Sequence, residues 1–260
     1  MPIEGSLEAW VIHFFMMVTR MSALFILSPI FGRNQIPMYV KIMLSMMMGF
    51  IAVQWYPPPA AMPPTLMHFA LQLSGELAVG LMIGWVTTLF FSVVYTAGQF
   101  IDMQIGFGMV QIYDVATNAQ VPVAGTLLNL VLVECFIVTD GLPKVVRLLF
   151  YSLEIIPVGE VSVTPAIGAL MLSGFVEAFI IALSVAAPIL TSAMVAEIAL
   201  GILVRTAPQM NIFAVGMPLK TLLGLLMLVV IMPIFVMFTN TIFENMWIFM
   251  SEVLKSIAPS

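Results

Sequence analysis

Apolar positions dominate the chain in six long stretches that contain almost no charged side chains. A membrane-spanning helix needs about 20 consecutive, mostly apolar residues. The strict two-residue alternation of membrane barrel strands is missing here. The pattern therefore predicts an all-α, membrane-associated protein with about six long apolar helices or helical hairpins. We expect these elements at Ala9–Phe31, from Lys41 to Tyr56, and at Leu66–Ile101, Ala124–Val138, Ala166–Val204 and Thr221–Phe243.

The fifth stretch is longer than a bilayer requires. It has 39 residues from Ala166 to Val204. As one helix it would be about 58 Å long, whereas the hydrocarbon layer is about 30 Å thick. Either the stretch is broken into a hairpin, for which Pro188 is the obvious position, or it extends well beyond the lipid. Both interpretations imply that protein partners cover apolar surface that lipid does not reach.

Composition agrees with this pattern and excludes several classes of function. Of the 260 residues, 62% are hydrophobic and 8% are charged, whereas soluble domains have roughly 25% charged residues. A soluble enzyme is therefore excluded first. The net charge of −5 leaves no basic stripe for a nucleic acid. Two histidines and the single Cys135 form no recognisable metal cluster, and catalytic motifs are missing, so we expect neither enzymatic activity nor a cofactor.

The segment Ala97–Gly125 combines glycines and amides with a lack of cations. Irregular backbone at membrane depth survives only where protein or a water-filled cavity satisfies its hydrogen bonds, which favours a loop that lines or closes a pore. The alternative is an ordinary connection between two helices, although long structureless connections are uncommon unless they serve as lids or binding loops. The candidate pore residues are Met103, Gly106, Phe107, Gly108, Met109, Gln111, Asn118 and Pro122.

A second group joins a carboxylate to small residues. Glu76, Gly80 and Gly84 recur every four residues, so they share one face of a helix along which another helix can approach closely. A carboxylate within an apolar span costs roughly 2.5 to 3.5 kcal/mol, so Glu76 should have a partner, and Arg20 is the candidate. The alternative is a solvated Glu76 at an interface. The spacing favours helix packing over activity.

A third group is the polar, helix-breaking link Gly201–Lys220 between two apolar elements. One interpretation is a cytoplasmic turn with snorkelling cations. The other is a docking loop for a partner, and the spacing alone does not decide between them. The candidate contact residues are Arg205, Pro208, Gln209, Asn211 and Lys220.

Four acids could suggest a proton relay: Glu134, Asp140, Glu177 and Glu197. No histidine at mid-span, paired cation or internal repeat supports a relay. We therefore expect these acids to cap or flank helices.

Several short motifs follow one another along nearly the whole chain. The first are Arg20-x-Ser22-Ala23, Pro29-x-Phe31-Gly32, Ile36-Pro37 and Gly75-Glu76-x3-Gly80-x3-Gly84. The next are Ala97-Gly98-Gln99-Phe100-Ile101-Asp102-x-Gln104-x-Gly106-x-Gly108 and Asp140-Gly141. The last are Arg205-x2-Pro208-Gln209-Met210-Asn211-Ile212-Phe213 and Gly216-x-Pro218-Leu219-Lys220. Together they resemble the FliR family of export-gate proteins in type III secretion. One departure is Leu142-Pro143-Lys144, where the family has a polar continuation.

The resemblance implies a single FliR-like export-gate domain over residues 1–260, in the bacterial inner membrane at the flagellar basal body. Its partners would be FliP-like and FliQ-like subunits and an FlhB-like protein, in a helical hetero-oligomeric export gate partly raised out of the membrane plane. Unfolded flagellar export substrates would pass through this gate, with membrane lipid around it and no nucleic acid involved. The resemblance also implies that Gly106–Pro122 is a plug across the closed channel.

Three alternatives stay open at this point. The chain would be a virulence-type type III secretion homologue, a stand-alone proton-coupled membrane transporter, or a structural scaffold whose loop never faces a channel. The context Pro208-Gln209-Met210-Asn211 favours the flagellar member of the family over the virulence type.

Overall fold

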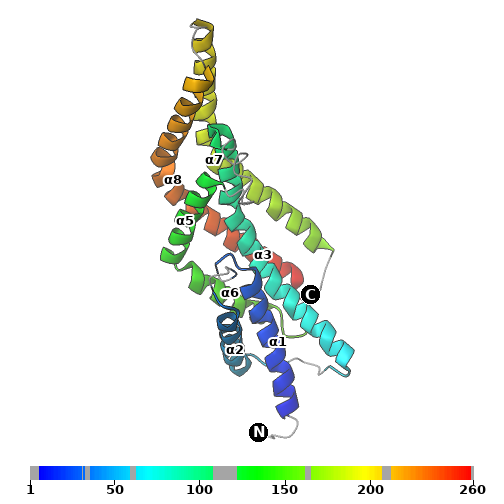
Figure 1. Ribbon diagram of the computed structural model, residues 1–260. Coiled ribbons are helices and arrows are strands. Elements are labelled where there is room, and N and C mark those ends of the chain that lie inside the picture. Colours follow the sequence, from blue (N-terminus) through cyan, green and yellow to red (C-terminus); the bar gives the residue numbers. More distant parts are fainter. Residues whose placement is uncertain are drawn as a thin grey trace. The chain divides into compact units, whose positions relative to one another are not determined.

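All regular secondary structure in the described residues is helical. The structure, a computed structural model, describes residues 6–30, 32, 36–58, 63–107, 122–161, 165–206 and 212–258. The prediction of an all-α fold is confirmed. In chain order (Figure 1) the helices are α1 (Ser6–Leu27), α2 (Met38–Trp55), α3 (Leu66–Ile105), α5 (Val123–Val138), α6 (Gly141–Ile155), α7 (Ala166–Thr206) and α8 (Ile212–Ile257).

The expected number of apolar elements is also confirmed. Among the described residues, five helices are long and apolar enough to cross a membrane, and α5 with α6 make a sixth candidate if the bent pair counts as one span. α5 alone has 16 residues, and a bend of 67° separates it from α6. Helix α6 is the element that the hydrophobic pattern did not predict. It carries Lys144, Arg147 and Glu154, so it is not one of the stretches that lack charged side chains.

Helix α7 is continuous over 41 residues, with Pro188 inside it. The hairpin expected as one possibility at Pro188 is therefore wrong, and the long-helix alternative holds. A proline removes one backbone hydrogen bond from a helix, and apolar helical bundles tolerate that loss where neighbours or local adjustments satisfy the freed carbonyl. Helix α8 is longer still, with 46 residues and prolines at 218 and 233.

The chain divides into two compact units, each assembled from segments far apart in sequence. Unit 1 comprises Met1–Phe90, Ile137–Gly174 and Glu244–Ser260, and unit 2 comprises Phe91–Phe136 and Phe175–Phe243. Helices α3, α7 and α8 each contribute residues to both units.

In unit 1, α1 lies alongside α2 and the first part of α3 (Figure 1). The face of α1 that carries Met17, Met21 and Leu24 is completely buried. Where α2 ends, the Tyr56 hydroxyl donates a hydrogen bond to the Glu154 carboxylate of α6 at 3.3 Å. Burial, together with the charge and hydrogen bond of Glu154, raises the pKa of Tyr56.

In unit 2, an aromatic cluster and a helical hairpin organise the core. The Phe91 and Phe136 rings are 5.1 Å apart, and Phe136 and Phe243 are 5.2 Å apart. α7 and α8 run antiparallel, because Glu197 near the end of α7 pairs with Lys220 near the start of α8. Figure 1 shows this hairpin continuing past the end of α3.

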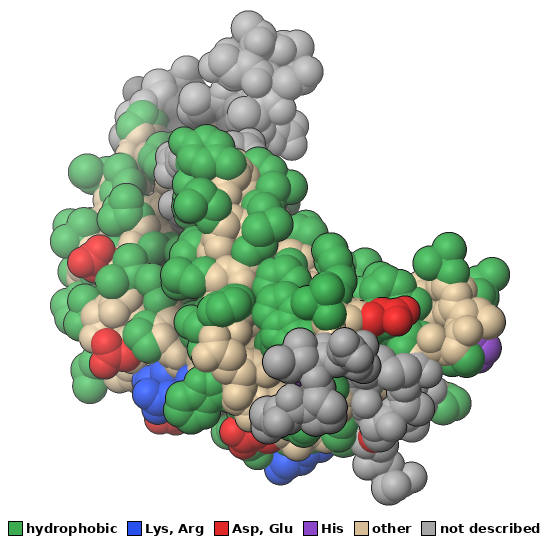
Figure 2. Space-filling view, turned by 90° about the horizontal axis from the view of Figure 1, so that it is seen from below, with side chains coloured by type: hydrophobic (Ala, Val, Ile, Leu, Met, Phe, Trp, Pro, Cys, Tyr) green, Lys and Arg blue, Asp and Glu red, His purple; other side chains and the backbone are tan. Residues whose placement is uncertain are grey.

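Much of the apolar surface of these helices stays uncovered within the chain. Figure 2 shows a face on which apolar side chains predominate and charged ones are few. On α8 the exposed fractions of Leu222, Val229 and Met237 are 63%, 70% and 75%. Exposure on this scale marks a surface that contacts lipid or other proteins.

Candidate functional site

The first candidate site is a buried ion pair in unit 1. Arg20 of α1 and Glu76 of α3 are both completely buried, and Arg20 Nε lies 2.5 Å from Glu76 Oε2. The spacing of small residues on α3 pointed to a close helix contact at Glu76, with Arg20 as the candidate partner. The structure brings these two residues together.

The rest of the guanidinium binds the end of α6. Arg20 Nη1 donates to the carbonyl of Ser152 at 3.0 Å, and both Nη1 and Nη2 donate to the carbonyl of Ile156 at 3.1 Å. The Ser152 carbonyl also accepts the Ile156 N–H at 2.9 Å. Carbonyls at the C-terminal end of a helix carry partial negative charge, so a cation is favourable there. The second carboxylate oxygen of Glu76 accepts the Gly159 backbone N–H at 2.8 Å. The pair thus joins α1, α3, α6 and the turn after α6.

Small residues let α1 and α3 approach closely enough to form this pair. A Cβ atom on Gly80 would collide with the carbonyl oxygen of Arg20 and lie 2.6 Å from Ala23 Cβ. A Cβ atom on Gly84 would lie 2.8 Å from Leu27 Cβ. One turn further, the Thr88 hydroxyl donates to the Leu27 carbonyl. This stripe brings the helices together by packing, without any catalytic arrangement.

The second candidate site lies in unit 2, where α3 ends and α5 begins. Gly106 terminates α3 with a φ of +97°, a conformation that glycine adopts at low cost. One turn earlier, Asp102 is 3% exposed, and its Oδ1 accepts the Ala124 backbone N–H of α5 at 3.1 Å. The end of α3 and the start of α5, which flank residues 108–121 in the sequence, are therefore in contact. We call the described residues around these two ends the stem.

Backbone packing and a third helix hold the stem. A Cβ atom on Gly98 of α3 would collide with the backbone of Gly125 of α5, so these two helices touch through their main chains. The Ile105 carbonyl accepts the Thr221 hydroxyl of α8 at 2.9 Å, and Gly224 of α8 packs against the Ile105 side chain. The end of α3 is thus fixed to both α5 and α8.

The expected pore residues fall partly on this stem. Met103 is 76% exposed, Gly106 ends α3, Phe107 is partly buried, and Pro122 is buried next to the start of α5. The remaining expected pore residues lie outside the described residues: Gly108, Met109, Gln111 and Asn118. The structure therefore describes the base of the expected loop.

Two of the expected partner-contact residues, Arg205 and Lys220, lie at the α7–α8 hairpin. Lys220 Nζ lies 2.9 Å from Glu197 Oε1, and the Gln104 amide donates to the other oxygen of Glu197 at 3.3 Å. The side chain of Glu197 is 59% exposed, so this pair contributes little to stability. Arg205 is exposed near the end of α7. Pro208, Gln209 and Asn211 lie outside the described residues.

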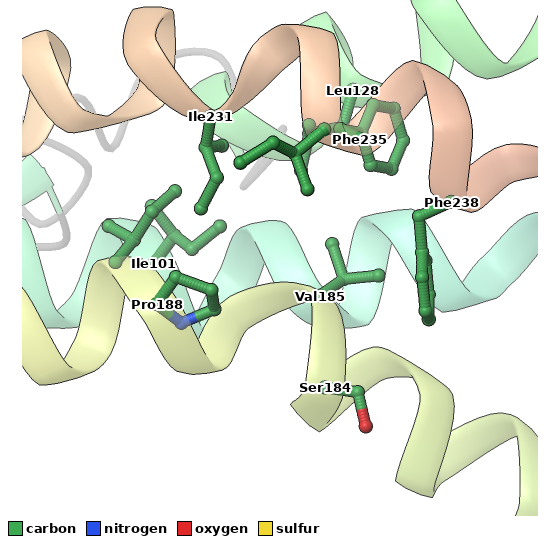
Figure 3. A pocket seen from close by; sticks show the side chains of 10 residues that line it. Ile101, Leu128, Ser184, Val185, Pro188, Ile231, Phe235 and Phe238 are labelled. Carbon is green, nitrogen blue, oxygen red and sulfur yellow. The ribbon is translucent and has the colours of Figure 1, made fainter.

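Unit 2 also contains a small apolar hollow of about 80 Å³ beside Pro188. Figure 3 shows side chains from α3, α5, α7 and α8 around it, among them Ile101, Leu128 and Phe235. Ser184 is the one polar side chain that lines it, and its hydroxyl donates to the Ile180 carbonyl of its own helix. A hollow with this lining offers no titratable group for chemistry.

Sequence reasoning missed several residues of both sites. Ser152 and Gly159 surround the ion pair, and Asp102 and Thr221 hold the stem. Asp102 carried a signal, because it is an acid inside an apolar stretch and in such a place needs a partner. The others bind through backbone atoms or a single hydroxyl, which no residue pattern marks. Within the described residues, no group of three or more His, Cys, Asp or Glu side chains could hold a metal ion.

Comparison with known proteins finds matches over most of the chain. Residues 11–246 match the family described as bacterial export proteins, family 1. The flagellar biosynthetic protein FliR of Bacillus subtilis is 29% identical over 236 residues, covering 89% of this chain and 90% of that protein. FliR of Escherichia coli is 28% identical over 251 residues, covering 96% and 95%. Yop proteins translocation protein T of Yersinia pestis is 31% identical over 164 residues, covering 62% of each chain.

Proposed function

Because the chain belongs to family 1 of the bacterial export proteins, we propose that it is a subunit of the flagellar type III protein export gate. With FliP-like and FliQ-like subunits, and an FlhB-like protein associated, it forms the closed channel through which unfolded flagellar proteins are exported. This gate lies in the bacterial inner membrane at the flagellar basal body. The subunit acts as a conduit, without a catalytic step and without a cofactor.

The observation that carries this proposal is the uncovered apolar surface of the α7–α8 hairpin. Of the 46 residues of α8, positions 212–243 lie in unit 2, and this part is about 48 Å long, which exceeds the thickness of the hydrocarbon layer, about 30 Å. Its large apolar side chains remain exposed along most of its course through unit 2. Lipid alone does not reach apolar surface of that length. Long apolar helices of partner subunits are the chemistry that fits it.

The stem in unit 2 supports a plug formed by Gly106–Pro122. This segment contains glycines and amides and no cation. Its two ends are held together by the Asp102–Ala124 hydrogen bond and the Gly98–Gly125 contact. A plug needs a fixed base, and the stem provides one. In this proposal the loop blocks ions until an export substrate displaces it.

Deleting Gly106–Gly108 tests the plug. Shortening the loop at its stem should leave the assembled complex leaky to small ions, measured as conductance or dye efflux in membranes that carry the complete gate. The matched control is Gly168→Ala, because a Cβ atom there has no neighbour within 4 Å. The control should behave like the unmodified complex. An unchanged leak in the deletion variant, with normal assembly, argues against a plug at this place.

Crosslinking separates a plug from a scaffold. A cysteine introduced at position 109, in a chain whose Cys135 is replaced by serine, should crosslink to an export substrate stalled in the gate. A scaffold whose loop never faces the channel gives no such product.

The virulence-type homologue and the stand-alone transporter are the other candidates. The flagellar relatives cover about nine tenths or more of this chain, and the translocation protein covers 62%, which favours the flagellar assignment. A stand-alone transporter predicts that the isolated chain transports a solute and loses transport when Glu177 or Glu197 is neutralised. Glu197 is exposed and paired with Lys220, which is not the buried setting of an intramembrane relay.

A further inference from the structure

Asp102 is a buried carboxylate whose hydrogen bonds run to another helix. It is 3% exposed, near the end of α3. Its Oδ1 accepts the backbone N–H of Ala124 at 3.1 Å. Val123 and Ala124 are the first two residues of α5. A buried acid that accepts a free N–H group in the first turn of a neighbouring helix performs the task of an N-cap.

Helix α5 needs this cap from outside because its own cap residue cannot provide one. The Pro122 carbonyl accepts the Thr126 N–H at 2.9 Å, which identifies Pro122 as the N-cap residue. Helices favour Ser, Thr, Asp or Asn at this position, since their side chains accept a free N–H group. Proline has no such acceptor. Asp102 supplies from α3 the acceptor that Pro122 lacks.

We propose that Asp102 is the positioning residue of the plug: its carboxylate ties the end of α3 to the start of α5 and so holds together the two helix ends between which residues 108–121 lie in the sequence. This inference rests on the proposed function for its consequence, the sealing of the channel. The tie itself is a property of unit 2 alone. Removing the carboxylate leaves the N–H group of the buried Ala124 without its acceptor and releases α5 from α3 at the stem.

A double variant separates the two roles of Asp102, capping α5 and holding α5 to α3. Asp102→Ala removes both the cap and the tie. Adding Pro122→Asp restores a carboxylate at the N-cap, but this carboxylate belongs to α5 itself and does not hold α5 to α3. Among the described residues, Asp102 Oδ2 has no hydrogen-bond partner. Asp102→Asn therefore fits the same place, keeps one acceptor oxygen and should show an intermediate effect.

Hydrogen exchange of the Ala124 amide in the purified gate complex measures the cap. We expect Asp102→Ala to accelerate this exchange by about tenfold, as for the loss of a hydrogen bond to a charged group. Pro122→Asp in the same chain should restore most of the protection. The matched control, Glu134→Ala, removes an exposed carboxylate from α5 and should leave the exchange of the Ala124 amide unchanged.

Spin labels at Met103 and Leu127, which are exposed on α3 and α5, measure the tie through the width of their distance distribution. We expect it to broaden in Asp102→Ala and to stay broad after Pro122→Asp is added. A width unchanged in Asp102→Ala, or restored by Pro122→Asp, overturns the proposal. If Asp102→Ala does not assemble, Asp102→Asn, alone and with Pro122→Asp, gives the same two readouts.

Ion leak then tests the consequence separately. A broadened distance distribution together with an ion leak supports both the tie and the plug. A broadened distance distribution without an ion leak supports the tie. If the Gly106–Gly108 deletion variant also shows no ion leak, the plug function is rejected.

Discussion

Arg20 and Glu76 illustrate how a bundle of apolar helices accommodates two charges. Each ion loses several kcal/mol of hydration when it is buried, and the pair recovers this only if the remaining donors and acceptors are also satisfied. Here the guanidinium reaches the Ser152 and Ile156 carbonyls, and the carboxylate receives the Gly159 N–H. The pair therefore specifies where α6 ends against α1 and α3.

Breaking the pair on one side should be more damaging than removing it. Glu76→Leu leaves the guanidinium buried without its counter-ion and should destabilise unit 1 by about 3–5 kcal/mol. The double variant Arg20→Met/Glu76→Leu should recover part of this loss. Recovery stays incomplete because the α6 carbonyls and the Gly159 N–H also lose their partners. The thermal midpoint of the purified complex measures the effect.

Two exposed residues provide the controls for this cycle. Arg147→Met and Glu8→Leu remove the same charges from exposed positions and should shift the midpoint little. A double variant as unstable as Glu76→Leu alone would show that the guanidinium contacts with α6, and not the unpaired charge, dominate the loss.

At the scale of elements, Asp140 lies between α5 and α6 in an unusual backbone conformation. Asp140 has φ +57° and ψ +33°, the left-handed conformation, and is followed directly by Gly141. Aspartate tolerates this conformation better than most residues, and a β-branched residue is strained in it. The bend of 67° lies between α5, which is too short to span a membrane alone, and the amphipathic helix α6. As expected from the sequence, Asp140 flanks a helix, but its side chain makes no capping hydrogen bond.

Substitutions at Asp140 should follow backbone conformation rather than charge. Asp140→Val should destabilise the complex by roughly 1–2 kcal/mol, because its Cβ branch clashes in the left-handed region. Asp140→Gly should be neutral or stabilising, and Asp140→Asn should stay within about 0.5 kcal/mol of the original. Thermal midpoints of the three purified variants rank them. Equal losses of stability in Asp140→Asn and Asp140→Val would show that the charge of Asp140 matters and not its backbone conformation.

At the scale of the whole molecule, the balance between covered and uncovered apolar surface decides behaviour. Of the most apolar window of α8, 17% is buried within the chain, against 56% for α3. A membrane protein that is stable as a monomer in lipid exposes apolar surface only over the thickness of the hydrocarbon layer. The hairpin of α7 and α8 exceeds that thickness, so its stability depends on other chains.

Co-expression tests this dependence. We expect the isolated chain in detergent to be polydisperse and rapidly cleaved by protease. Co-expression with FliP-like and FliQ-like subunits should give one monodisperse complex in which α7 and α8 are protected, because long apolar helices of the partners cover them. Co-expression with an unrelated membrane protein of similar length is the control. A monodisperse, protease-resistant monomer in the absence of partners contradicts the proposed assembly.

Much of the fold could be predicted from local pattern, and the exceptions have physical causes. Ion-poor stretches identified α1, α2, α3, α5, α7 and α8, because the hydrophobic effect acts on every apolar residue regardless of its neighbours. Helix α6 was not predicted, because its charged residues interrupt the apolar stretch. Its amphipathic character becomes apparent only when the partner of its apolar face is known. The interpretation of Pro188 as a hairpin break failed, because one lost backbone bond does not outweigh the packing around a long helix.

The sequence by itself determined the class of the protein: an apolar, all-helical chain with a cation-free glycine segment and motifs of an export family. These properties follow from residue identity and short-range spacing. Tertiary structure alone decided which helix ends meet. Arg20 reaches the carbonyls of α6, and Asp102 caps α5 across 22 residues, because free N–H and carbonyl groups at helix ends accept any suitable partner that packing brings near. Such pairings depend on where helices lie in space, and no local pattern encodes that.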